Sequence, residues 1–158
     1  MIVETKEKLK EVIDSAKAEG KSVLVKKGVF DIIHPGHTHA MKMFSEQADV
    51  VVILVQSDAL TKKKKGELRP VNNQEHRALV VDGLKGVDYV FEDKCMSRDE
   101  YRAFLDYLKP TVVAVTAIDE EKTKAYTSAE WELKEFPDKK MPGFSTTEVI
   151  DRCRGKPQ

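Results

Sequence analysis

Two histidines, His34 and His37, lie three residues apart in the stretch GVFDIIHPGH, which covers residues 28–37. A helix that binds a metal ion usually carries histidines four residues apart with a carboxylate nearby, so this spacing does not match. Gly28 and Gly36 predict a turn from a strand into a helix, where backbone can approach a ligand and free N–H groups bind anions. Imidazoles at such a turn can donate hydrogen bonds to phosphate oxygens. We predict that both histidines handle phosphate rather than fill the core.

The stretch Ser145-Thr146-Thr147-Glu148 combines two signals. A serine followed three residues later by glutamate is a capping box, which predicts that a helix begins at about residue 146. The hydroxyl groups and backbone N–H groups of the same helix start can bind phosphate. We therefore expect this turn to serve both structure and ligand binding.

Four consecutive lysines, Lys62 to Lys65, precede Gly66. Such a run often binds nucleic acid, but 27 basic and 27 acidic side chains cancel to a formal net charge of +0. No overall field then attracts nucleic acid or an anionic membrane. We expect instead a mobile loop that brings one or two lysines onto phosphate. The chain has no GxxxxGK motif, which excludes a P-loop as the phosphate site.

Helical and strand patterns alternate along the chain. Residues 4–18 place apolar side chains such as Leu9 and Ile13 on one face, which predicts an N-terminal helix. Apolar runs of strand length cover Ser22–Val25, Val50–Val55, Tyr89–Phe91 and Thr111–Val115. Buried strands separated by helices are typical of a parallel sheet, so we predict an α/β fold with helices on both faces and a single domain over residues 1–158. Ligands bind such sheets at the carboxyl ends of the strands, where the histidine stretch falls.

The chain carries no signal for secretion or membrane insertion. Its first residues have no unbroken apolar segment, and no apolar run could span a bilayer. Cys95 and Cys153 lie far apart and form no CxxC pair, which favours two reduced thiols over a zinc site. We expect a cytoplasmic protein that binds neither nucleic acid nor membrane.

The stretch at residues 28–37 resembles the G-x-F-D-x-x-H-x-G-H signature of the cytidylyltransferase-like nucleotidyltransferases. The segments GFSTTEVI at residues 143–150 and NNQEHRALVV at residues 72–81 resemble two further segments of this family. Within the family, residues 6–152 are most similar to the adenylyltransferase domains of bacterial ADP-heptose synthases. The resemblance implies a Rossmann-like fold and a reaction in which a nucleoside triphosphate and a phosphorylated acceptor give a nucleotidyl-acceptor and pyrophosphate.

The resemblance also implies roles for individual residues. The catalytic residues would be His34, His37 and Lys65. The nucleotide would be bound by Gly28, Val29, Phe30, Asp31, Gly36, Arg77, Gly143, Ser145, Thr146 and Thr147. The acceptor would be bound by Lys62 and Asp119. Mg²⁺ would be held mainly by the phosphates of the nucleotide, with no protein ligand expected, and the family suggests a homodimer.

The chain departs from its relatives at three places. Residues 115–119, Val-Thr-Ala-Ile-Asp, replace the Lys-Gly-Gly-Asp of the heptose enzymes and the Gly-Asp-Asp-Trp of the glycerol-3-phosphate cytidylyltransferases. Lys27 replaces an asparagine of the heptose enzymes, which adds charge near the phosphates. Lys140 is the best match to the arginine of the cytidylyltransferases, which favours ATP over CTP.

These observations predict transfer of AMP to a phosphorylated sugar. Three other functions stay open. The chain could be a cytidylyltransferase of the glycerol-3-phosphate type or an FMN adenylyltransferase, and it could also be a nucleotide-binding protein without catalytic activity. The intact histidine pair and Ser-Thr-Thr segment make the last of these the weakest alternative.

Overall fold

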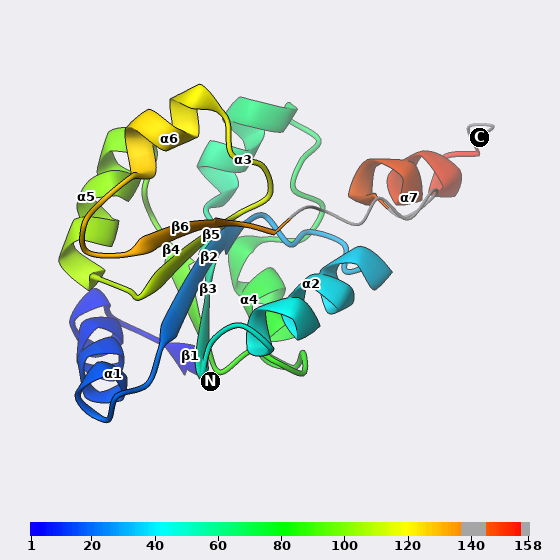
Figure 1. Ribbon diagram of the computed structural model, residues 1–158. Helices are drawn as coiled ribbons and strands as arrows, with labels where there is room; N and C mark the ends of the chain where they lie inside the picture. Colours follow the sequence, from blue (N-terminus) through cyan, green and yellow to red (C-terminus); the bar gives the residue numbers. More distant parts are fainter. Residues whose placement is uncertain (137–144, 156–158) are drawn as a thin grey trace.

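Six strands form one parallel sheet in the computed structural model, which describes residues 1–136 and 145–155 (Figure 1). The strands lie in the order β1-β4-β3-β2-β5-β6. Their bounds are β1 (Ile2–Val3), β2 (Val23–Gly28), β3 (Val50–Gln56), β4 (Tyr89–Asp93), β5 (Val112–Val115) and β6 (Glu132–Glu135). Every pairing is parallel, so the α/β fold with a parallel sheet is confirmed.

The four expected strands became β2 to β5, and the sequence did not reveal β1 and β6. Strand β1 has only two residues, and β6 reads Glu-Leu-Lys-Glu without an apolar run. Both lie at edges of the sheet, where a strand pairs with a neighbour on one side only. An edge strand can therefore be short or polar. Hydrogen bonding to a neighbouring strand, rather than local composition, makes these segments strands.

Helices cover both faces of the sheet (Figure 1). The described helices are α1 (Lys6–Ala18), α2 (Pro35–Ser45), α3 (Asp58–Lys65), α4 (Gln74–Asp82), α5 (Arg98–Leu108), α6 (Glu120–Tyr126) and α7 (Thr146–Cys153). Alternate residues of a strand point to opposite faces, which divides the core in two. Val23 and Val25 pack with α1 and α5, whereas Leu24 packs with α2 and α4. Among the described residues, no helix is both long enough and apolar enough to cross a membrane.

The lysine run is not a loop, contrary to expectation. Lys62 to Lys65 form the last turn of α3, which ends at Gly66 with a φ of 92°. Ser57 caps the start of this helix, and Leu60 and Thr61 anchor it in the protein. Lysines near the C-terminal end of a helix interact favourably with its dipole, so the run stabilises the helix.

Candidate functional site

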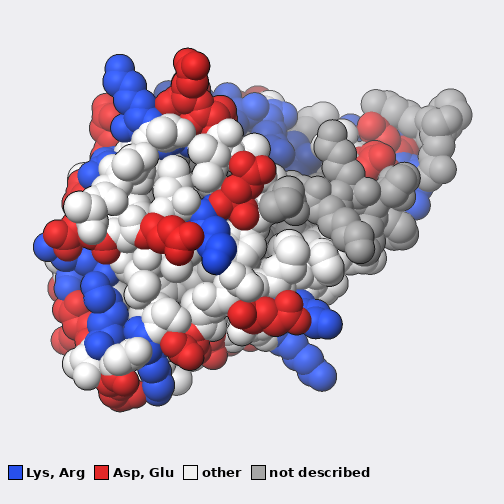
Figure 2. All heavy atoms as spheres, viewed as in Figure 1, with Lys and Arg blue, Asp and Glu red and all other residues white. Residues whose placement is uncertain are grey.

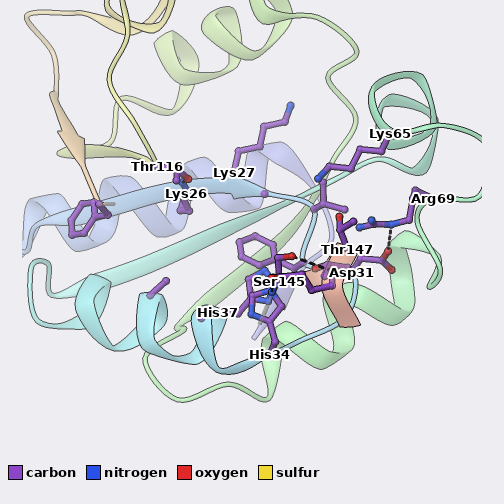
Figure 3. Close-up of a pocket in the computed structure, with 18 of the residues that line it drawn as sticks. Lys26, Lys27, Asp31, His34, His37, Lys65, Arg69, Thr116, Ser145 and Thr147 are labelled. Atoms are coloured by element: carbon purple, nitrogen blue, oxygen red, sulfur yellow. Dashed lines mark hydrogen bonds and ion pairs between the residues drawn. The ribbon is translucent and has the colours of Figure 1, made fainter. Parts of the chain in front are cut away.

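A cavity of about 760 Å³ opens at the carboxyl ends of the central strands (Figure 3). Its walls combine segments from distant parts of the sequence, namely the end of β2, the start of α2, the end of α3 and the first turn of α7. Most residues that the sequence singled out line this cavity: Gly28, Val29, Phe30, Asp31, His34, Gly36, His37, Lys65, Ser145, Thr146 and Thr147.

Three of the predicted site residues do not line the cavity. Arg77 is buried in the core, Lys62 is exposed on α3, and Asp119 is exposed at the start of α6. The carboxylate of Asp119 accepts hydrogen bonds from the backbone and the ammonium group of Lys122, at 2.8 and 2.7 Å, and so caps α6. The predictions for Gly143 and Lys140 fall outside the described residues.

The two histidines meet at the N-terminus of α2, as the turn pattern predicted. His34 is the N-cap residue, and Pro35 begins the helix. The ring centroids of His34 and His37 are 3.9 Å apart, and both side chains lie at the cavity (Figure 3). Nδ1 of His37 is buried and has no hydrogen-bond partner among residues 1–136 and 145–155. The imidazole of His37 is therefore at the cavity without being tied to the fold through this nitrogen.

Burial sets the charge of His37. It lowers the pKa of His37 to about 4, and the nearby His34 contributes in the same direction. His37 is therefore a neutral imidazole at neutral pH, with one nitrogen that donates and one that accepts. It can donate a hydrogen bond to a phosphate oxygen without carrying a full charge.

Gly28 makes room for the aromatic ring that supports the histidines. Phe30 has a φ of 51°, in the left-handed region, and its ring folds back over Gly28. A Cβ atom at position 28 would lie 2.6 Å from Cε2 of Phe30. The same ring lies 5.4 Å from the ring of His37, centroid to centroid. Gly28 thus permits the Phe30 conformation that packs against His37.

We expect Gly28→Ala to lower both stability and catalytic turnover. The added methyl group must displace the Phe30 ring, and overpacking of this kind costs about 1–3 kcal/mol. Gly83→Ala is the matched control, because a Cβ there meets only the Val80 carbonyl oxygen at 3.6 Å. Thermal unfolding and pyrophosphate release, measured on both variants, test this prediction. Equal behaviour of the two variants would contradict it.

Asp31 organises the cavity rim rather than offering a free carboxylate. Its side chain accepts hydrogen bonds from Nε of Arg69 at 2.8 Å and from the backbone N–H groups of Val71 and Asn72 at 2.9 and 3.0 Å. The side chain is fully buried. Arg69 is thereby held at the cavity, where it supplies a positive charge that sequence reasoning missed. Its position in a polar loop gave no pattern that could have identified it.

Arg77 connects the loops that shape the site. Its guanidinium donates to the carbonyl oxygens of Val29, Gln56 and Asn72 and forms an ion pair with Asp58 at 2.7 Å. These bonds join the end of β2, the end of β3 and the loop before α4. The side chain is inaccessible to solvent. In this structure Arg77 therefore stabilises the backbone around the site and does not line the cavity.

The first turn of α7 closes the cavity with the predicted capping box. The Ser145 hydroxyl oxygen accepts a hydrogen bond from the Glu148 backbone N–H at 3.1 Å, and the Glu148 carboxylate accepts one from the Ser145 N–H at 2.7 Å. In Figure 3, Ser145 lies beside the histidine pair, and Thr147 lies nearer to Asp31 and Arg69. The positive end of the helix dipole and the hydroxyl groups therefore face the same space as the imidazoles.

Two lysines at the end of β2 add positive charge. The ammonium group of Lys26 donates to the Thr116 hydroxyl oxygen at 3.1 Å, and Lys27 forms an ion pair with the buried Asp93. The sequence suggested charge at Lys27 but gave no role to Lys26. Consecutive strand residues point to opposite faces, yet both reach the cavity because it lies at the end of the sheet.

The described residues contain no cluster of side chains that could hold a metal ion by themselves. No group of three or more His, Cys, Asp or Glu side chains suited to a metal occurs in the part of the chain that the structure describes. The acidic side chains at the cavity are Asp31 and Glu148, and both accept hydrogen bonds from the protein itself.

Comparisons with known proteins agree with this geometry. A protein-family model described as Cytidylyltransferase-like matches residues 25–152. The chain is 42% identical over 98 residues to the bifunctional protein HldE of Salmonella arizonae, which covers 61% of this chain and 20% of that protein. It is 31% identical over 152 residues to the bifunctional protein HldE of Marinomonas sp., which covers 92% of this chain and 30% of that protein. The chain thus spans about a third or less of the length of these relatives.

A solved structure shares the fold. The lipopolysaccharide core biosynthesis protein from Thermoplasma volcanium aligns with a TM-score of 0.57 and 22% identity, covering 74% of this chain and 99% of that one. At this identity the likeness concerns the fold alone. The family match over residues 25–152 contains the histidine turn and the Ser-Thr-Thr segment that meet in the cavity. The chain belongs to the cytidylyltransferase-like family of nucleotidyltransferases.

Proposed function

We propose that the protein transfers AMP from ATP to the phosphate group of a phosphorylated sugar and releases pyrophosphate. The observation that carries this proposal is the meeting of His34, His37 and the first turn of α7 around one cavity. Three sets of phosphate-binding groups from distant parts of the chain converge there: the two imidazoles, a helix N-terminus and lysine or arginine side chains.

The proposed reaction needs no general base. An oxygen of the acceptor phosphate is already anionic and attacks the α-phosphorus of the nucleotide. The bond between that phosphorus and the oxygen bridging to the β-phosphate breaks, and pyrophosphate leaves with the electron pair. The protein aligns the two substrates and stabilises the charge on the leaving group. His34 and His37 would donate to phosphate oxygens, and Ser145 and Thr147 would bind the leaving phosphates.

The choice of nucleotide and acceptor rests on the sequence resemblance and on the names of the relatives. Sequence similarity to the adenylyltransferase domains of ADP-heptose synthases favours ATP and a phosphorylated sugar. The relatives named HldE are consistent with that choice. Mg²⁺ would arrive with the nucleotide, bound by its phosphates. A cytoplasmic location and a homodimer remain part of the proposal, and sedimentation analysis tests the dimer.

A panel of substrates tests the proposed function. Pyrophosphate release is measured with ATP, CTP, GTP and UTP in the presence of magnesium, first with heptose 1-phosphate, then with glycerol 3-phosphate and FMN. We expect ATP with a sugar phosphate to give the highest kcat/KM. Preferred turnover of CTP, or of ATP with FMN, would support the other family activities instead. Nucleotide binding without turnover on any acceptor would favour a non-catalytic role.

The lysine run gives a prediction that depends on position. Lys65 lines the cavity, whereas Lys62 and Lys63 are exposed on the same helix outside it. Lys65→Ala should weaken binding of nucleotide or acceptor about tenfold, since a charge-assisted hydrogen bond contributes about 1.5–3 kcal/mol. Lys62→Ala should have a smaller effect, and Lys63→Ala is the control for loss of one charge. Calorimetric titration measures these affinities, and equal losses at all three positions would contradict a specific phosphate contact.

A further inference from the structure

Lys27 lines the cavity, and contacts with the protein fix the position of its ammonium group. Its side chain is only 12% exposed, and its ammonium group forms an ion pair with Asp93, whose side chain is 1% exposed. The same ammonium group lies 4.6 Å from the centroid of the buried Tyr101 ring. A surface lysine would be free to move, but this one is held by a carboxylate and an aromatic face.

The sheet register explains how this pair forms. Lys27 on β2 pairs with Leu54 on β3, and Gln56 of β3 pairs with Asp93 on β4. The Lys27 side chain therefore crosses β3 to reach Asp93 on the same face of the sheet. This places its ammonium group at the carboxyl edge of the three strands, and Lys27 is one of the residues that line the cavity.

The ammonium group has a donor left for a ligand. It carries three N–H donors, and its contacts are the ion pair with Asp93 and the face of the Tyr101 ring. Asp93 is itself committed, because its other carboxylate oxygen accepts a hydrogen bond from the Cys95 backbone N–H at 3.0 Å. These two contacts leave the ammonium group of Lys27 able to donate a hydrogen bond to a ligand oxygen in the cavity as well.

Positive charge is concentrated on this side of the cavity. Lys65 at the end of α3 lines the same cavity, and Figure 3 shows Lys27 and Lys65 above the histidine pair. Burial, together with the nearby charges of Lys27 and Arg98, lowers the pKa of Lys64. In Figure 2, blue side chains gather over the last turn of α3 beside the grey region. An anionic ligand would reduce the repulsion among these positively charged side chains.

The in-line geometry of nucleotidyl transfer indicates which substrate the positive charge of Lys27 and Lys65 would bind. The attacking oxygen and the leaving pyrophosphate must lie on opposite sides of the α-phosphorus. Under the proposed function, the α7 turn with Ser145 and Thr147 binds the leaving phosphates. The acceptor phosphate must then lie on the other side, toward β2 and α3. We propose that Lys27, positioned by Asp93, binds the phosphate of the acceptor together with Lys65 and so selects phosphomonoester acceptors.

This inference rests on the proposed function for the identity of the ligand, but its test does not need turnover. The variant is Lys27→Met combined with Asp93→Asn, which removes both charges and leaves no buried carboxylate without a partner. Lys63→Met is the control for the loss of one positive charge, since Lys63 lies on α3 outside the cavity. Thermal unfolding establishes that each variant is folded.

The measurement is calorimetric titration with inorganic phosphate and with glycerol 3-phosphate, on protein saturated with α,β-methylene ATP to fill the nucleotide site. We expect the double variant to bind both probes at least about tenfold more weakly, which corresponds to about 1.4 kcal/mol, and to bind the ATP analogue as the parent protein does. The control should bind all three compounds like the parent protein.

Two results would overturn the inference. Unchanged affinity for both phosphate probes in the folded double variant would mean that Lys27 and Asp93 form a structural pair only. A selective loss of affinity for the ATP analogue would place Lys27 on the nucleotide side. If the parent protein does not bind the ATP analogue, the proposed function fails, whereas titration of phosphate alone still tests Lys27.

Discussion

Replacement of His37 by alanine is expected to reduce pyrophosphate release by about 10²- to 10³-fold, the range found when one preorganised donor to a developing charge is removed. His37 is neutral, because burial and the neighbouring His34 lower its pKa to about 4. Its side chain lines the cavity, and its buried Nδ1 has no hydrogen-bond partner among the described residues, so the fold does not use this nitrogen. His34→Ala should have an effect of the same order, since the two rings lie 3.9 Å apart at the same helix start.

The control for this prediction is His76→Ala. His76 is exposed on α4 and lies outside the cavity, so turnover should stay near that of the parent protein. Steady-state kinetics under the best substrate pair would show a loss in kcat larger than any rise in KM, because the contacts strengthen in the transition state. Thermal unfolding should change little in all three variants. Turnover near the parent value in His37→Ala would remove this residue from the catalytic groups.

Replacement of Arg77 by alanine is expected to destabilise the protein by about 3 kcal/mol or more, because three carbonyl oxygens lose their buried donor and each unsatisfied buried acceptor costs about 1–3 kcal/mol. The variant leaves Asp58 without its ion-pair partner and the carbonyl oxygens of Val29, Gln56 and Asn72 without their donor. Arg77→Lys should recover little of this, since one ammonium group cannot reproduce the geometry of a guanidinium with several bonds.

Arg98→Ala is the matched control for Arg77. Arg98 also forms an ion pair, with Glu121 at 2.7 Å, but its side chain is 56% exposed and a surface pair contributes about 0–1 kcal/mol. Denaturant unfolding of the three variants measures the differences. The family resemblance assigned Arg77 to the nucleotide. A stable Arg77→Ala protein with weakened nucleotide affinity would support that role and contradict the structural one.

The sequence by itself determined the features that depend on neighbouring residues. The apolar runs predicted β2 to β5 because a strand buried on both faces needs continuous apolar side chains. Gly28, Pro35 and the two histidines predicted the turn into α2, since glycine and proline act on the local backbone. The capping box at Ser145 set the start of α7, because its hydrogen bonds join residues only three apart.

Only the tertiary structure decided what each charged side chain does. The sequence contains no sign that Asp31 binds Arg69 or that Lys27 reaches Asp93 across β3, because these partners are distant in the chain. Asp119 caps its own helix instead of facing the cavity, although its residue type suits a sugar hydroxyl. A carboxylate, ammonium or guanidinium group can bind protein or ligand equally well.

The partner of such a group is therefore set by the packing around it. Arg77 lies in a segment that resembles the one with a nucleotide-binding arginine. In the structure, however, its guanidinium donates hydrogen bonds to the carbonyl oxygens of Val29 and Gln56, at the ends of β2 and β3. The helical state of Lys62 to Lys65 has the same origin, since Leu60 and Thr61 are anchored by contacts that local composition does not reveal. Backbone geometry follows from short-range preferences, whereas the choice among partners for a charge depends on which groups the folded chain brings within hydrogen-bond distance.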